Sequence, residues 1–203
     1  MYKKPVIVFE GIEGSGKTHH ISNVTKYFRK KKIKYIHIRE PGGSYNAEKL
    51  RKLILSNKSK FNENTDLLLY LAARSENIRL LKKHYKKKII LIDRFTDSTI
   101  AYQHFGLGID RNLIDIINKF LLSNLKVNFT FLNIVNKKNM IKRLKSRKNL
   151  NRYDKFNHNF YDKVQSGFLK LARKNNKKYQ IINSNLDIKK NEKLIIEKIN
   201  KLI

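Results

Sequence analysis

The feature that most constrains the fold of this chain is a phosphate-binding loop motif close to its start. The residues Gly11-Ile12-Glu13-Gly14-Ser15-Gly16-Lys17-Thr18 match every fixed position of the pattern G-x-x-x-x-G-K-[ST]. The apolar run Val6-Ile7-Val8-Phe9 precedes the motif, and Ile21, Val24 and Phe28 follow it with helical spacing. A strand, a glycine-rich loop and a helix in this order are typical of proteins that bind nucleotides on a parallel sheet.

The residue types in this motif each suit the binding of phosphate. Glycines let the backbone curl so that several N–H groups point at one polyphosphate, and the helix N-terminus adds partial positive charge. Lys17 can reach the terminal phosphates, and the hydroxyl of Thr18 can ligate Mg²⁺. A glycine-rich turn without a ligand is the alternative, but the complete motif in this context favours binding. We therefore predict that residues 11–18 bind a nucleoside triphosphate.

Short β-branched runs alternate with longer helical patterns along the 203 residues, which indicates a parallel sheet covered by helices. The predicted strands are Val6–Glu10, Tyr35–Arg39, Ile89–Asp93, Phe129–Ile134 and Tyr179–Ile182. The predicted helices are Thr18–Lys31, Ala47–Ser56, Asp66–His84, Ser98–Phe105, Arg111–Ser123, Lys138–Lys145, His158–Asn175 and Lys189–Lys201. No repeat or linker-like segment interrupts the pattern, so we predict one α/β domain over residues 1–203.

Charged residues stand at the carboxyl ends of the predicted strands, where ligands collect in open parallel sheets. Asp93 ends an apolar strand, and a carboxylate there commonly holds Mg²⁺, often through water. Arg94 follows it and offers a planar, bidentate donor for a phosphate; the alternative is a structural ion pair. Glu10 ends the first strand and can orient a second substrate or a metal-bound water, or can be paired with Arg39 or Arg94.

Two further segments carry candidate binding residues. Asp66, Tyr70 and Arg74 are spaced four apart on one helix face, where a ring and a guanidinium can form a platform for a nucleobase. The alternative is that Tyr70 is core and Arg74 is solvated. The stretch 146–155 is rich in cations and lies between two helical patterns, so it can close as a lid over a triphosphate or remain a flexible loop. Its arginines, Arg147 and Arg152, match the geometry of phosphoryl oxygens.

The composition permits one alternative class of function. The chain has 46 Lys and Arg against 16 Asp and Glu, for a net charge of +30, which is also the electrostatic footprint of a nucleic-acid-binding NTPase. Because the lysines are scattered, solvated basic faces are favoured, and no specific nucleic-acid partner is expected. The chain has no cysteine, no signal-peptide pattern and no apolar run of membrane-spanning length. We expect a cytoplasmic protein without membrane association.

Four further segments, taken with the phosphate loop, identify a family resemblance. They are Arg39-Glu40-Pro41-Gly42-Gly43, Tyr70-Leu71-Ala72-Ala73-Arg74, Asp93-Arg94-Phe95 and Ser98-Thr99-Ile100-Ala101-Tyr102-Gln103. In this order the motifs resemble those of bacterial thymidylate kinases, up to about Asp154. The resemblance implies a five-stranded parallel P-loop kinase fold, a three-layer α/β/α arrangement with a mobile lid at about 146–155. It also implies a homodimer that transfers the γ-phosphoryl group of ATP to dTMP with Mg²⁺. Another monophosphate kinase or a deoxynucleoside kinase is the nearest alternative enzyme.

The same resemblance implies which residues contact the base and sugar of dTMP. Tyr70 would stack on thymine, and Arg74 and Gln103 would address the edge of the base. Thr99 would lie beside them. Tyr102 would crowd a ribose 2′-hydroxyl and so favour deoxyribose.

The resemblance further implies the residues near the phosphates and the metal. Arg51 and Arg94 would hold the dTMP phosphate, and Glu40 and Pro41 would contribute to the same acceptor site. Glu10 would lie near the sugar and the metal.

The catalytic residues that the resemblance implies are Lys17, Arg94 and an arginine of the lid. The interior of the phosphate loop has no arginine, so this chain resembles the members that supply one from the lid, as Arg147 or Arg152. Thr18 and Asp93 are the predicted Mg²⁺ residues.

Overall fold

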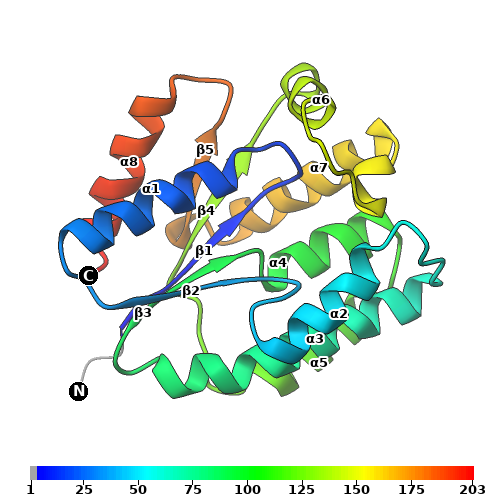
Figure 1. The fold of residues 1–203 in the computed structure, drawn as a ribbon, viewed down its shortest axis with the longest axis horizontal. Helices are drawn as coiled ribbons and strands as arrows, with labels where there is room; N and C mark the ends of the chain where they lie inside the picture. Colours follow the sequence, from blue (N-terminus) through cyan, green and yellow to red (C-terminus); the bar gives the residue numbers. More distant parts are fainter. Residues whose placement is uncertain (1–3) are drawn as a thin grey trace.

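Five parallel strands form the central sheet of the described part of the chain (Figure 1). The structure is a computed structural model, and it describes residues 4–203. The strand order is β2-β3-β1-β4-β5. The bounds are β1 Val6–Glu10, β2 Tyr35–Arg39, β3 Ile89–Asp93, β4 Phe129–Ile134 and β5 Tyr179–Asn183. The predicted strands are therefore confirmed, and β5 is one residue longer than its prediction.

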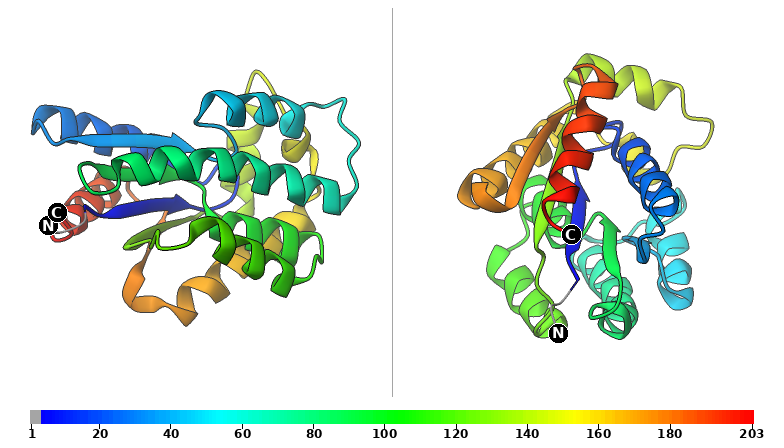
Figure 2. Two further views of the ribbon diagram at one scale, coloured as in Figure 1. Left: turned by 90° about the horizontal axis from the view of Figure 1, so that it is seen from below. Right: turned by 90° about the vertical axis from the view of Figure 1, so that its left-hand side faces the viewer.

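Helices cover both faces of this sheet, so the predicted three-layer α/β fold is confirmed (Figure 2). The bounds are α1 Lys17–Lys30, α2 Tyr45–Leu55, α3 Glu63–His84, α4 Thr96–Thr99, α5 Arg111–Leu122, α6 Lys137–Lys145, α7 His158–Lys174 and α8 Ile188–Asn200. Short helices η1 Ile100–Gly106, η2 Arg152–Lys155 and η3 Asn176–Lys178 connect them. Among residues 4–203, no helix has the length and apolar character to cross a membrane.

The alternation of side chains along the strands explains the two covered faces. Ile7 and Phe9 of β1 pack with residues of α1 and α8 on one face. Val6 and Val8 point the other way and pack with residues of α3. Every β1 residue is buried, and the four residues before Glu10 form a continuous apolar run, as expected for the middle of a parallel sheet.

The parallel register brings the chemistry-bearing strand ends to one edge of the sheet. Phe9 is the register partner of Asp93, and Arg39 pairs with Asp93 from the other side. The phosphate loop follows β1 at this edge and leads directly into α1. The segment before α6 and the one after β5 reach the same edge (Figure 1).

The predicted helix Ser98–Phe105 differs from the structure in its geometry. Residues 96–99 form the short helix α4, and residues 100–106 continue it as the π-helix η1. The N–H of Leu107 donates to the carbonyl of Tyr102 at 3.0 Å, five residues back. Apolar spacing cannot distinguish a π-turn from an α-turn, because both bury one side of the same segment. The predicted loop 146–155 likewise contains the short 3₁₀ helix η2, which Asn151 caps.

Candidate active site

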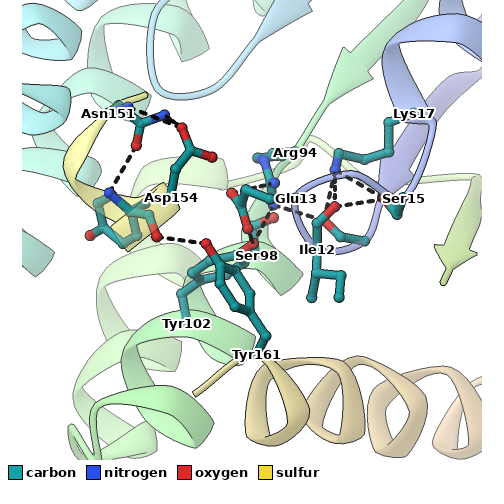
Figure 3. Close-up of polar contacts among 12 residues, drawn as sticks. Ile12, Glu13, Ser15, Lys17, Arg94, Ser98, Tyr102, Asn151, Asp154 and Tyr161 are labelled. Carbon is teal, nitrogen blue, oxygen red and sulfur yellow. Dashed lines mark hydrogen bonds and ion pairs between the residues drawn. The ribbon is translucent and has the colours of Figure 1, made fainter. Parts of the chain in front are cut away.

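The phosphate loop holds an open, curled backbone at the N-terminus of α1. Gly11 has φ +138°, and a Cβ at this position would lie 2.2 Å from the carbonyl oxygen of Asn133, so the close approach of β4 requires glycine. Lys17 Nζ donates to the carbonyls of Gly11 at 2.8 Å and Ile12 at 2.9 Å (Figure 3). Burial and then the charge of Arg94 lower the pKa of Lys17 to about 7. A phosphate anion at the loop would compensate this buried cation.

A pocket of about 300 Å³ opens beside the phosphate loop. The predicted residues that line it are Glu13, Lys17, Thr18, Glu40, Pro41, Arg51, Tyr70, Arg74, Asp93, Arg94, Thr99, Tyr102, Gln103 and Arg147. The predicted residues that do not line it are Glu10, Gly11, Ile12, Gly14, Ser15, Gly16 and Arg152. The structure thus brings one end of the phosphate loop together with residues from β3, α2, α3 and η1.

Arg94, Glu13 and Tyr102 form a charged cluster between the loop and the pocket (Figure 3). Arg94 donates to Glu13 Oε1 at 2.8 Å and to the carbonyl of Gly11 at 2.8 Å. The hydroxyl of Tyr102 donates to the other oxygen of Glu13. Burial would raise the pKa of Glu13, but Arg94 and Lys17 outweigh it and hold that pKa below its usual range. The cluster therefore fixes the guanidinium of Arg94 at the wall of the pocket.

The far wall of the pocket is built on the buried guanidinium of Arg74. Arg74 is only 2% exposed, so the alternative in which it is solvated is wrong. The guanidinium donates to Glu40 at 2.8 Å, to Thr99 Oγ1 at 2.9 Å and to Asn118 Oδ1 at 2.6 Å. Gln103 is also buried in this wall, and its Nε2 has no hydrogen-bond partner in the described structure. This buried amide donor is therefore available to an acceptor atom of a ligand in the pocket.

Arg51 and Arg39 lie at the outer end of the pocket. Arg51 Nη1 donates to the carbonyl of Pro41 at 2.6 Å, so the Glu40–Pro41 turn and α2 position each other. Arg39 forms an ion pair with Glu48 at 3.1 Å. The predicted alternative in which Arg39 or Arg94 pairs with Glu10 is therefore wrong, because each has a different carboxylate partner.

Glu10 lies beneath the pocket and supports the segment after β3. It is fully buried, and it accepts from the N–H of Phe95 at 2.8 Å and from the hydroxyl of Ser98 at 2.5 Å. Burial and then the Asp97 carboxylate raise the pKa of Glu10 to about 7. Its contact with the pocket is thus indirect, through the residues whose backbone it holds.

Asp93 and Thr18 are suitable for the magnesium ion that the sequence predicts. Both residues line the pocket, and Asp93 Oδ1 is buried without a hydrogen-bond partner in the described structure. Within residues 4–203, no group of three or more His, Cys, Asp or Glu residues could hold a metal. Mg²⁺ is commonly bound through one or two protein oxygens together with phosphates and water, so this sparse set fits it.

The two candidate lid arginines have different surroundings. Arg147 lines the pocket, is 40% exposed and pairs with Asp154 at 2.7 Å. Arg152 instead contacts the carboxylate of Asp66 and donates through Nε to the carbonyl of Ile54 at 2.5 Å. The structure therefore does not bring Arg152 into the pocket.

Several lining residues were not predicted as site residues. They are His37, Arg39, Leu55, Phe95, Ser98, Asn151 and Tyr153. Arg39 stands at a strand end, which is a usable signal. Tyr153 could be found only by its position next to Arg152, and Ser98 only through its long-range contact with Glu10.

A phosphate loop, a carboxylate at a strand end and arginines converging on one pocket define a P-loop phosphotransferase. The family model described as thymidylate kinase matches residues 9–195. The chain belongs to the thymidylate kinase family, and it phosphorylates dTMP to dTDP.

Individual relatives agree with this family. The chain is 37% identical over 169 residues to a thymidylate kinase of Thermosipho africanus, covering 82% of this chain and 84% of the relative. It is 30% identical over 193 residues to one of Kosmotoga olearia, covering 94% and 93%. A crystal structure of thymidylate kinase from Ehrlichia chaffeensis superposes with a TM-score of 0.78 at 30% identity, covering 98% and 99%. The predicted family and fold are confirmed.

Proposed function

We propose that this pocket binds dTMP and that residues 11–18 hold MgATP, so that the γ-phosphoryl group passes to the dTMP phosphate in line. The observation that carries the proposal is the single pocket that joins Lys17 of the phosphate loop to Tyr70, Arg74 and Gln103. These three residues supply a ring for stacking and donors for the edge of a base. Arg94 lines the same pocket as Arg74, so one pocket offers groups for both a base and a phosphate.

The residues around the reacting phosphates act by alignment and charge. Lys17 and the loop amides orient the donor triphosphate, and Arg94 and Arg51 hold the acceptor phosphate. Arg147 supplies positive charge from the lid to the phosphoryl group in transfer. Thr18 and Asp93 would hold Mg²⁺, which neutralises charge on the phosphate oxygens when bound. The acceptor is an ionised phosphate, so no general base is required.

A substrate panel tests the proposed acceptor. We expect strong ADP release from ATP and Mg²⁺ with dTMP, weaker release with dUMP, and negligible release with UMP, CMP, AMP and GMP. A coupled assay of ADP formation measures all six in parallel. Preference for a ribonucleotide would contradict the assignment of Tyr102 and Arg74. NTP hydrolysis stimulated by DNA or RNA, without monophosphate turnover, would support the nucleic-acid alternative.

We also propose that the protein is a homodimer that pairs through α5 and the adjoining α3. Leu113, Ile116 and Phe120 are spaced along one face of α5 and are 43%, 66% and 80% exposed. Helix α3 packs against α5, and its residue Leu68 is also exposed. Large exposed apolar side chains on two helices that pack together are typical of a subunit interface.

A cytoplasmic location of the protein stays a prediction. Cell fractionation tests it.

The substitution Phe120→Lys tests this interface. We expect it to shift the protein from dimer to monomer at micromolar concentration, because it places a charge in the proposed apolar contact. Light scattering coupled to size-exclusion chromatography measures the mass. Leu186→Lys is the matched control, since Leu186 is also a large apolar residue, is 65% exposed and lies outside α3 and α5. A dimer that survives Phe120→Lys would move the interface elsewhere.

A further inference from the structure

The lid segment is attached to the helices that build the acceptor side of the pocket. Arg152 reaches the carbonyl of Ile54 at the end of α2 and the carboxylate of Asp66 in the first turn of α3. Asn57, in the loop between these helices, donates to the carbonyl of Leu150 at 2.8 Å. These contacts join the part of the lid after residue 149 to α2 and α3.

Asp66 is the centre of this attachment. It is buried, and both of its carboxylate oxygens have partners in the lid: one contacts Arg152 and the other accepts from the hydroxyl of Tyr153. Its place in the first turn of α3 adds a favourable interaction with the helix dipole. A buried carboxylate with two partners on another segment is costly to expose, so it holds that segment in place.

Tyr153 carries this attachment into the acceptor pocket. Its ring lies 5.9 Å from the ring of Tyr70 and 6.0 Å from that of Tyr102, in edge-on arrangements. Its backbone carbonyl accepts from the hydroxyl of Tyr161 at 2.6 Å. Tyr153 lines the pocket, so one wall of the acceptor site comes from the lid itself.

We propose that Asp66 is a positioning residue that holds Tyr153 against the acceptor aromatic residues and keeps Arg152 out of phosphate chemistry. The lid then has two parts. The part around Tyr153 is docked on α3 and shapes the acceptor site, whereas Arg147, which the ion pair with Asp154 joins to this part, serves the phosphoryl group. This inference rests on the proposed function of the pocket as a dTMP site.

The substitution Asp66→Asn tests the proposal, with Glu63→Gln as the matched control. Glu63 is exposed in the same turn of α3 and loses the same charge without a lid contact. We expect Asp66→Asn to raise KM for dTMP about tenfold, the size expected for a lost charge-assisted contact. KM for ATP should stay within about twofold. Glu63→Gln should match the unsubstituted protein in both constants.

Hydrogen exchange of the lid provides a readout that does not depend on turnover. Peptides covering residues 146–157 should exchange faster in Asp66→Asn and unchanged in Glu63→Gln. Tyr153→Phe keeps the ring and removes one hydroxyl contact, so it should show the same changes at smaller size. It also keeps the proposal testable if Asp66→Asn does not fold.

Two outcomes would overturn the proposal. A fall in kcat with unchanged KM for dTMP would place Asp66 and Arg152 in phosphoryl transfer. Unchanged lid exchange in both variants would show that Asp66 does not hold the lid. If the unsubstituted protein fails to phosphorylate dTMP, the proposed function fails, and the exchange comparison still decides whether Asp66 holds the lid.

Discussion

Replacement of Lys17 by alanine is expected to lower turnover by about a hundredfold to a thousandfold, as the loss of one preorganised charge at a transferring group does elsewhere. Lys17 is buried at the base of the pocket, and its Nζ contacts only groups of the phosphate loop itself. The ammonium ion makes no ion pair with a carboxylate, and Glu13, whose charge it helps to stabilise, keeps its ion pair with Arg94 when Lys17 is removed. The fold should therefore persist while the donor phosphates lose their cation.

The measurement is kcat and KM for both substrates, with circular dichroism and thermal unfolding to verify the fold. Lys26→Ala is the matched control, because Lys26 is exposed on the same helix α1. The control should retain full turnover. Near-normal kcat in Lys17→Ala would remove this residue from the mechanism.

Replacement of Arg94 by alanine should have an effect of similar or larger size, about a thousandfold in kcat/KM for dTMP. Arg94 is the guanidinium that the structure fixes between the phosphate loop and the acceptor side, through Glu13 and the carbonyl of Gly11. Unlike Lys17, Arg94 forms an ion pair with a partly buried carboxylate, that of Glu13. Its loss removes the strongest stabilisation of the Glu13 charge, so Arg94→Ala should also lower the thermal stability of the fold.

A double variant separates these two effects of Arg94. In Arg94→Ala combined with Glu13→Gln, the buried charge is removed, so most of the thermal stability should return while turnover stays low. Arg94→Lys keeps a positive charge without the planar fork and should recover only part of the rate. Recovery of turnover together with stability in the double variant would contradict a direct role of Arg94 in transfer.

The sequence predicted the sheet and the phosphate loop well because both depend on local patterns. Val6–Glu10 and Ile89–Asp93 are short apolar runs that a parallel sheet buries on both faces, and their ends were predicted to the residue. The loop motif is contiguous, so its chemistry is visible in eight consecutive residues. Asp93 and Arg94 were found for the same reason, since they stand directly after a strand.

The parts that the sequence did not predict depend on contacts between distant segments. Asn118 holds Arg74 from 44 positions away, and Glu10 holds Ser98 from 88. Arg152 resembles a second phosphate-binding arginine in the sequence, because its charge is evident there and its ion pair with Asp66, 86 positions away, is not. Spacing along one segment shows which side chains share a face, but it does not show which group of another helix meets them.

The π-helix η1 makes the arrangement of the acceptor pocket sensitive to the length of the chain at this point. An i→i+5 turn contains one residue more than an α-turn, and here Ala101, Tyr102 and Gln103 are buried in succession. Loss of a single residue after Gln103 would restore the ordinary turn and rotate the following backbone, although every pocket side chain would still be present in the chain. The shape of this pocket, and with it the selectivity of the site, therefore depends on the number of residues in η1 as well as on their chemistry.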